Sequence, residues 1–294
     1  MQSQSLDDSA VRVSRVGLGC NNFGRRVDFD GTRAVVEAAL DAGITFFDTA
    51  DIYGGGDSER FLGEILKDRR DSLVLATKFG MAQGGGGTRE YVRRAIDASL
   101  ERLQTDYVDL YYYHRPDGVT PIAETTRAIA ELVDEGKVRH IGISNVDATQ
   151  VAEAAAAGNL AAVQNEYSLL NRSAEGDVLP RCVELGVGFV PYFPLAHGLL
   201  TGKYRKGEPP PQGSRLEGSK DRLTDEALER VERLERFASE HGHSLLELAI
   251  GALASEPGVV SVIAGATKPE QVRANAAAGG WKLGAAERDA LRRL

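Results

Sequence analysis

The sequence predicts an α/β fold, a closed (β/α)8 or TIM barrel in which strands and helices alternate. The chain has 294 residues, which suits one barrel of about 250 residues with insertions. Short β-branched or aromatic runs alternate with longer helical patterns along most of its length, as in repeated βαβ units around a parallel sheet. We therefore expect one barrel domain covering residues 1–294.

Eight short apolar runs are the candidate strands of this barrel. Each is rich in β-branched or aromatic residues and is followed by polar or glycine residues, the pattern of a buried parallel strand. They cover residues 16–20, 44–48, 73–79, 107–114, 138–144, 161–167, 187–193 and 259–265.

Helical patterns fill the intervals, with apolar residues at i, i+3, i+4 and i+7. Among them are residues 30–43, 87–103 and 121–137. Two patterns separate the last two strands, so one of them is an addition to the repeat, and a last barrel helix and a capping helix follow near the C-terminus. These four are 223–242, 244–256, 269–280 and 284–294.

The composition limits the class of partner. A formal net charge of -8 argues against nucleic acid or an anionic membrane surface, because both require a basic face. No segment reaches about 18 uninterrupted apolar residues, the length needed to span a bilayer. Cys20 and Cys182 are the only cysteines and the N-terminal residues are polar, so no disulfide framework or secretory signal is expected. The expected location is the cytoplasm, and the oligomeric state is not predicted.

Two loops rich in glycine or proline interrupt the repeat. Residues 80–90 follow the third candidate strand and residues 205–220 follow the seventh. Loops after strands lie on the face where a barrel builds its site. We expect both loops, with Asn22 and Phe23, to shape a substrate pocket.

Polar side chains gather where the candidate strands end. In a closed barrel these positions converge on one face although they are far apart in sequence. Asp48 ends the second strand with Tyr53 just beyond it, Lys78 lies at the end of the third and His114 at the end of the fourth. The later strands contribute Ser144, Asn145, Gln164, Asn165, Tyr192 and Gly265.

A phenol, an ammonium, a carboxylate and an imidazole in one pocket suit carbonyl reduction. A phenol has a pKa near 10 and needs a nearby cation to become a useful acid. Lys78 could supply that charge, with Asp48 as its counter-charge. Tyr53 and His114 would hold a carbonyl oxygen while it gains negative charge, and Tyr53 would protonate the alkoxide. The hydride must come from a cofactor, because no side chain donates one.

Other patterns in the sequence give weaker evidence about function. GLGCNNFG (17–24) has Asn22 where a dinucleotide-binding motif needs glycine. His241 and His243 lack a nearby sulfur ligand, so no metal is expected. Tyr111, Tyr112 and Tyr113 are expected to pack, with alternate rings facing the helices. A lyase or aldolase that forms a Schiff base at Lys78 stays open as an alternative enzyme.

Several motifs together resemble the NADPH-dependent, bacterial-type aldo-keto reductases. They are FDTADIYG, the Lys in ATKFG, the His in DLYYYHRPD, GISN, VQNEYS, PLAHGLLTGKY and IAGATKPEQVRAN, and the resemblance covers residues 11 to about 278. It implies a barrel opened by a small N-terminal β-hairpin, and an NADPH bound extended without a Rossmann motif. It also implies Tyr53 as general acid, Lys78 and Asp48 as the pair that tunes it, and His114 as the orienting donor.

The same resemblance implies a cofactor site, with NADPH expected and NADH as the alternative. Phe193, Gln271 and Ala274 depart from residues that many relatives use near the phosphates or the adenine. The implied cofactor residues are Gly19, Cys20, Asn21, Asp48, Ser144, Asn145, Gln164, Tyr192, Phe193, Pro194, Leu195, Ala196, Gly198, Leu200, Lys203, Arg215, Gly265, Thr267, Lys268, Gln271 and Asn275.

The sequence thus predicts an NADP-dependent oxidoreductase of the alcohol dehydrogenase or carbonyl reductase class that reduces small aldehydes or ketones to alcohols. His114 favours carbonyl chemistry, because a relative that reduces carbon–carbon double bonds is expected to replace it. Some members of the family bind NADPH with little turnover, so a non-enzymatic NADPH-sensing module is the other alternative. The substrate itself stays open among sugars and small or aromatic aldehydes.

Overall fold

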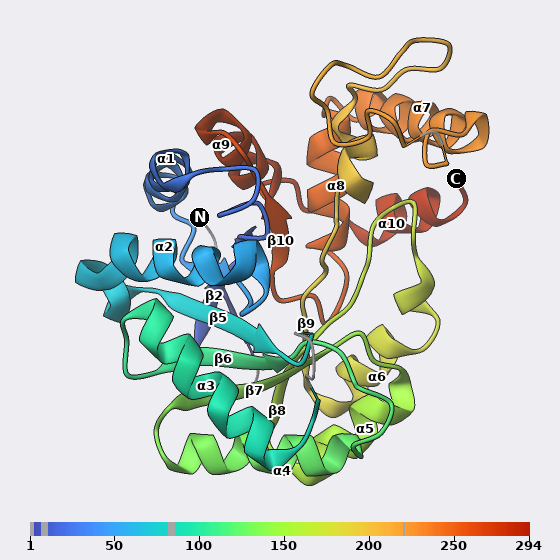
Figure 1. The fold of residues 1–294 in the computed structure, drawn as a ribbon. Coiled ribbons are helices and arrows are strands. Elements are labelled where there is room, and N and C mark those ends of the chain that lie inside the picture. Colours follow the sequence, from blue (N-terminus) through green and yellow to red (C-terminus); the bar gives the residue numbers. More distant parts are fainter. Residues whose placement is uncertain (1–2, 7–10, 82–85, 220) are drawn as a thin grey trace.

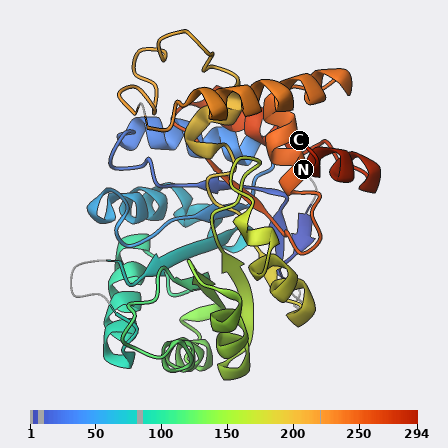
Figure 2. The ribbon, with the colours of Figure 1, turned by 90° about the vertical axis from the view of Figure 1, so that its right-hand side faces the viewer.

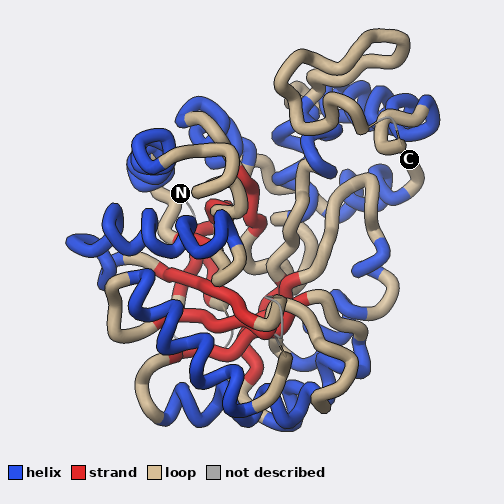
Figure 3. The backbone as a smooth tube through the Cα atoms, viewed as in Figure 1, coloured by secondary structure: helices blue, strands red, loops and turns tan. Residues whose placement is uncertain are grey.

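A computed structural model describes residues 3–6, 11–81, 86–219 and 221–294. Its main feature is an eight-stranded parallel sheet in the order β10-β3-β4-β5-β6-β7-β8-β9. Phe189 bridges to Val259 in parallel, and this contact joins the two edges of the sheet. The helices lie outside the strands (Figures 1 and 3). The predicted barrel is therefore confirmed.

The strands agree with the sequence prediction in place and order. The 138–144 run is a strand over its whole length, whereas the seventh run, 187–193, forms only a two-residue strand. Pro191 has no N–H for a ladder and Phe193 has a positive φ of 53°, so the strand stops early. The sheet strands are Val16–Gly19 (β3), Phe46–Asp48 (β4), Val74–Phe79 (β5), Val108–Tyr113 (β6), Val138–Ser144 (β7), Leu160–Gln164 (β8), Gly188–Phe189 (β9) and Val262–Gly265 (β10).

The helices follow the predicted patterns. Two of them, α7 and α8, separate β9 from β10, as expected for a barrel with one added helix. The α-helices are Phe29–Asp41 (α1), Asp57–Leu66 (α2), Arg89–Leu103 (α3), Ile122–Asp134 (α4), Ala148–Ala157 (α5), Val178–Leu185 (α6), Asp225–Glu240 (α7), Leu245–Leu253 (α8), Pro269–Ala278 (α9) and Ala285–Arg292 (α10). None of the helices in the described ranges has the length and apolar character needed to cross a bilayer.

Short 3-10 segments complete the connections: Tyr53–Gly56 (η1), Lys67–Ser72 (η2), Ser173–Glu175 (η3) and Ala196–Thr201 (η4). The long segment between η4 and α7 runs as an irregular loop beside α7 in both ribbon views (Figures 1 and 2). It contains the described part of the predicted 205–220 loop. Both η1 and η4 follow strands directly, so their side chains lie at the carboxyl end of the barrel.

A two-stranded antiparallel hairpin precedes the barrel, as the resemblance implied. Its strands are Ser3–Ser5 (β1) and Arg12–Ser14 (β2). Leu6 and Val13 are fully buried in a cluster that fills the barrel interior. The Ser14 hydroxyl accepts hydrogen bonds from the Thr45 and Phe46 amides at 3.1 and 3.3 Å, at the start of β4. The hairpin thus covers the amino ends of the strands.

The core has two layers, and β6 shows how one strand serves both. Tyr111 and Tyr113 belong to the cluster between strands and helices, whereas Tyr112 points into the barrel interior. The predicted alternation of the three rings is confirmed. Gly142 on β7 makes room for Tyr112, because a Cβ there would lie 2.3 Å from the Cδ1 atom of the ring.

Candidate functional site

A cavity of about 940 Å³ opens at the carboxyl ends of the strands. Its walls come from residues after nearly every strand, so the barrel brings together side chains that are far apart in the chain. The predicted residues that line it are Gly19, Cys20, Asn21, Asp48, Tyr53, His114, Ser144, Asn145, Gln164, Tyr192, Phe193, Pro194, Leu195, Gly198, Lys203, Arg215, Gly265, Thr267, Lys268, Gln271 and Asn275.

Some predicted residues are not part of the cavity wall. Phe23, which was expected to shape the substrate pocket, is fully buried in the hydrophobic core, and Asn165 does not line this cavity. Lys78 is fully buried beneath it. Ala196 and Leu200 are buried in the core under η4. The helical pattern of η4 breaks at His197, which has a positive φ of 58°, and His197 lines the cavity instead.

Asp48 and Lys78 form a buried ion pair at the floor of the cavity. Their side chains are 2% and 0% exposed. The Lys78 ammonium donates to Asp48 Oδ1 and to the Thr49 carbonyl at 2.9 Å. Asp48 Oδ2 accepts from Gln164 Nε2 at 2.9 Å. Each charge is therefore compensated, as a buried pair requires.

The pair keeps Lys78 protonated. Burial alone would lower the pKa of Lys78, but the charge of Asp48 and its hydrogen bond to the ammonium raise it above its ordinary value of 10.5. An ammonium in this state places a fixed positive charge below the cavity floor.

Tyr53 lies between this charge and His114. Its ring centroid is 5.3 Å from Lys78 Nζ and 5.9 Å from the imidazole centroid, with the two rings edge to face at 83°. Burial raises the pKa of Tyr53 above 10, and Lys78 acts in the opposite direction. The sequence prediction named only the Lys78 effect; burial outweighs it, so the phenol holds its proton at neutral pH.

His114 is neutral at physiological pH. Burial, then the charges of Lys78 and Arg115, lower its pKa to about 3. Its backbone carbonyl accepts from Asn145 Nδ2 at 2.8 Å, and Asn145 Oδ1 accepts from the Tyr192 hydroxyl at 2.7 Å. Within the part of the chain that the structure describes, His114 Nδ1 is buried without a hydrogen-bond partner. The hydrogen bonds from Tyr192 to Asn145 and from Asn145 to His114 fix the backbone of His114 and leave its ring available to a ligand.

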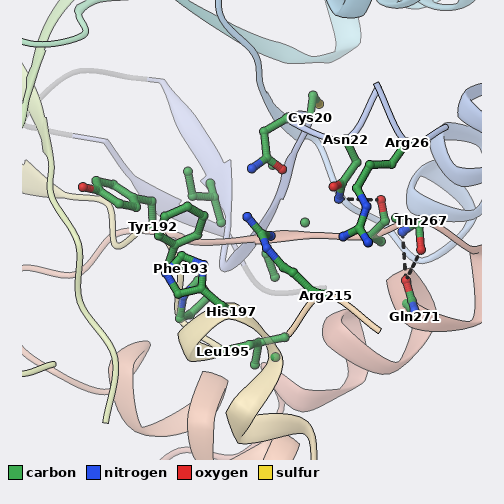
Figure 4. A pocket seen from close by; sticks show the side chains of 18 of the residues that line it. Cys20, Asn22, Arg26, Tyr192, Phe193, Leu195, His197, Arg215, Thr267 and Gln271 are labelled. Carbon is green, nitrogen blue, oxygen red and sulfur yellow. Dashed lines mark hydrogen bonds between the residues drawn. The ribbon is translucent and has the colours of Figure 1, made fainter. Parts of the chain in front are cut away.

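Cationic side chains line the middle of the cavity. The Arg215 guanidinium lies 5.1 Å from the centroid of the Phe193 ring, which stacks obliquely with His197 at 4.2 Å. Burial, then the charges of Arg26, Arg25 and Arg222, lower the pKa of Arg215. Figure 4 shows Arg26 and Arg215 reaching toward each other across the cavity. Like charges gathered in this way favour an anion between them.

The far end of the cavity lies at the start of α9. Gln271 Oε1 accepts from the Thr267 amide at 2.8 Å and from its hydroxyl at 3.2 Å, as drawn in Figure 4. Lys268 is the N-cap residue of α9, with no side-chain cap. Amides at a helix start and a neighbouring lysine suit a phosphate. Asn22 Nδ2 donates to the Ala266 carbonyl at 3.2 Å and holds the first loop against this end.

Sequence reasoning missed several residues of the cavity wall. They include Ile52, Arg115 and Arg26. Arg115 follows His114 and Ile52 precedes Tyr53 in the sequence. Adjacency to a predicted site residue was therefore a usable signal. Of the two predicted loops, Met81 and residues 211–215 line the cavity, whereas residues 82–85 lie outside the described part of the chain.

His241 and His243, which the sequence analysis did not expect to bind a metal, are not part of the cavity wall. His243 stacks on Trp281 with ring centroids 4.0 Å apart, and its Nδ1 contacts Glu247 at 3.1 Å. Within the described residues, no group of three or more potential ligands is close enough to hold a metal ion. Cys20 and Cys182 are buried free thiols.

Fold and cavity together define a class, the α/β barrels that bind ligands at the carboxyl ends of their strands. The sequence profile of the Aldo/keto reductase family matches residues 15–294. The chain therefore belongs to the aldo/keto reductase family, oxidoreductases that act on carbonyl compounds, and the resemblance inferred from its motifs is confirmed.

Two relatives and one solved structure illustrate this kinship. The chain is 39% identical over 295 residues to a probable voltage-gated potassium channel subunit beta of Oryza sativa subsp. japonica, covering 94% of this chain and 90% of that protein. It is 34% identical over 299 residues to an L-glyceraldehyde 3-phosphate reductase of Escherichia coli K12, covering 94% and 86%. The structure of the glycerol dehydrogenase AKR11B4 from Gluconobacter oxydans superposes with a TM-score of 0.88 at 28% identity, covering 99% and 94%.

Proposed function

We propose that this protein is an NADP(H)-dependent oxidoreductase that reduces aldehydes or ketones to alcohols, with Tyr53 as the general acid. The observation that carries the proposal is the grouping of Tyr53, His114 and the Asp48–Lys78 pair at the floor of one elongated cavity. A proton donor, a neutral imidazole and a buried cation in one place match the needs of a carbonyl oxygen that becomes an alkoxide.

Each residue has a distinct task in this reaction. The nicotinamide, when bound, supplies the hydride. Tyr53 holds its proton at neutral pH, because burial raises the pKa of its phenol, and it delivers that proton to the substrate oxygen. Neutral His114 orients the same oxygen. Lys78 stabilises the phenolate that Tyr53 becomes, and Asp48 holds Lys78 in place.

The cations of the cavity favour NADPH over NADH. Arg26 and Arg215 reach toward each other across the cavity, and Lys268 lies at its far end. A 2′-phosphate adds about two negative charges for such side chains to bind. The Tyr192 ring, the Ser144 hydroxyl and the side-chain amides of Asn145 and Gln164 suit the nicotinamide end, as the family resemblance implied. NADH is the alternative, and competition between the two cofactors tests the preference.

Two alternatives receive different support. A Schiff base at Lys78 needs a neutral, accessible amine, but this ammonium is fully buried and paired with Asp48. A cofactor-binding regulatory subunit is the second candidate, because one relative carries a channel-subunit name. Tight NADPH binding without oxidation across a wide panel of carbonyl compounds would favour that candidate.

The test replaces the tyrosine hydroxyl alone. Tyr53→Phe is expected to lower kcat at least about a thousandfold, within the range that a positioned proton donor contributes, and to keep the Kd for NADPH within about threefold. Tyr107→Phe is a matched control, because the Tyr107 hydroxyl bonds to Asp71 just before β6, away from the cavity. Nicotinamide absorbance reports turnover, and a Tyr53→Phe enzyme with full activity would contradict the proposal.

We further propose a cytoplasmic location, which the two buried free thiols support, because such thiols are typical of a reducing compartment.

A further inference from the structure

A second cavity of about 560 Å³ adjoins the first. The two share Arg115, Asn145 and Tyr192 in their walls, so they meet beside His114. This second cavity is not lined by Arg26, Arg215 or Lys268, the residues proposed to bind the cofactor phosphates. Figure 4 shows Tyr192 at one end of the labelled residues and Thr267 with Gln271 at the other. A ligand group in the second cavity would therefore belong to the substrate.

The loop that carries Arg115 is held rigidly on both sides. The carbonyl of His114 accepts from Asn145 Nδ2 at 2.8 Å. The Asp117 amide donates to the Tyr113 hydroxyl at 2.8 Å, and Pro116 between them has a fixed φ. Asp117 Oδ1 accepts from the Val119 and Thr120 amides at 2.9 and 2.7 Å. The backbone of Arg115 is thus positioned before any ligand arrives.

The Arg115 guanidinium is exposed and free to bind a ligand. Within the described ranges it makes no hydrogen bond or ion pair, although ion pairs are frequent elsewhere on this acidic chain. Its charge reaches both neighbouring rings: it lowers the pKa of His114 after burial and Lys78, and it opposes the effect of burial on Tyr192. A cation this close to the reacting centre acts on whatever binds there.

The other polar groups of the second cavity are mostly occupied. Asp147 caps α5 and Asp177 caps α6 with their side chains. Asn165 bonds through its side chain to both backbone groups of Val146. Glu166 is the carboxylate that, within the described residues, lines this cavity without a bonded partner. Among the described residues that line this cavity, Arg115 is the one cationic side chain, and Glu166 is the carboxylate outside a helix cap that opposes an anion.

We propose that Arg115 is a specificity-determining residue that binds an anionic group of the substrate, so that the preferred substrates are aldehydes or ketones carrying a carboxylate or a phosphate. The planar guanidinium can donate two parallel hydrogen bonds to either group. Ile52 and Met81, each 40% exposed, supply apolar surface in the main cavity for the body of the same molecule. The inference rests on the proposed carbonyl reduction.

The test compares two substrates that differ by one charge. 4-Carboxybenzaldehyde and its neutral methyl ester have the same carbonyl group and ring, so the ratio of their kcat/KM values measures recognition of the anion. The wild-type enzyme is expected to prefer the carboxylate. Arg115→Gln is expected to lower the ratio about tenfold, the size of one hydrogen bond to a charged group, mainly through KM. Arg115→Lys is expected to fall between the two, because the charge remains without the planar fork.

Glu166→Gln is the matched control in the same cavity. Removing this carboxylate is expected to raise the ratio, the opposite direction from Arg115→Gln, and high salt is expected to reduce the wild-type preference. Equal losses on both substrates in Arg115→Gln, or a wild-type ratio below one, would overturn the inference and leave carbonyl reduction intact. Failure of the wild-type enzyme to oxidise NADPH with either aldehyde would instead count against the proposed function.

Discussion

Replacing Asp48 with asparagine tests how the fold stabilises a charge that it has buried. The Lys78 side chain is 0% exposed, and its ammonium donates hydrogen bonds to Asp48 and to the Thr49 carbonyl. In Asp48→Asn, Lys78 loses its counter-charge. The new amide must also turn its NH2 group toward one of two donors, Lys78 Nζ or Gln164 Nε2. A buried cation is left poorly compensated.

The size of the effect follows from this geometry. Breaking a buried pair by removing one partner costs about 3–5 kcal/mol, and the retained Thr49 contact places this case in the lower half, about 3–4 kcal/mol. For 294 residues, an unfolding entropy of about 2.1 cal/mol/K per residue gives about 0.6 kcal/mol per kelvin. The melting temperature should therefore fall by roughly 5–7 °C.

The dependence of the free energy of unfolding on pH provides a second, independent test. Asp48 helps raise the pKa of Lys78 above its ordinary 10.5, so the pair's stabilisation is complete below that value and is lost as pH rises through the folded-state pKa. In Asp48→Asn, burial acts without this opposition and lowers the pKa of Lys78. The difference between the two proteins should thus be largest near neutral pH and shrink as the pH approaches and passes about 10.5.

Urea unfolding at pH 7 and pH 10 provides the assay, with Lys78→Met and the double variant Asp48→Asn/Lys78→Met completing the cycle. The double variant should recover most of the loss, because the uncompensated cation is gone. A loss below about 1 kcal/mol at pH 7, or a double variant no more stable than Asp48→Asn, would refute the reasoning.

Three further predictions concern other parts of the barrel. Gly142→Ala should destabilise by about 2–3 kcal/mol, because its Cβ would lie 2.3 Å from Tyr112; an unchanged urea midpoint would contradict the packing. Burial would raise the pKa of Asp117, but amide donors hold it at about 2, so the stability difference between wild type and Asp117→Asn should persist above pH 4 and vanish by about pH 2. His114 has a pKa of about 3, so the pH profile of kcat/KM should show no break near 6.5; a break there that His114→Gln abolishes would exclude this assignment.

Much of the fold could be predicted because a parallel strand buried on both faces leaves a plain apolar run. The run 138–144 matches β7 at both ends, since Val138, Ile141 and Ile143 distribute β-branched residues along it. The run 187–193 looks similar, yet Pro191 and the positive φ of Phe193 end β9 after two residues. A run of residue types does not encode which backbone groups find partners, so strand length is the weaker prediction.

The candidate site also contains residues that could be predicted from the sequence and residues that could not. Asp48, Tyr53, Lys78 and His114 could be grouped from sequence, because barrel closure brings strand ends together wherever they occur in the chain. Arg26 could not, since a charge in a loop has no periodicity and its direction depends on the backbone. Ala196 shows the same limit: it has a positive φ of 45°, which no property of alanine would suggest.

The N-terminal hairpin has a consequence for the order of events at the site. Leu6 and Val13 plug the barrel from the amino side, and Tyr53 lies at the base of the cavity on the other side. Cofactor and substrate must then enter through the same opening. The molecule that binds deeper has to bind first and dissociate last. Under the proposed function, steady-state kinetics should be sequential and ordered, with release of the deeper molecule setting the pace of each cycle.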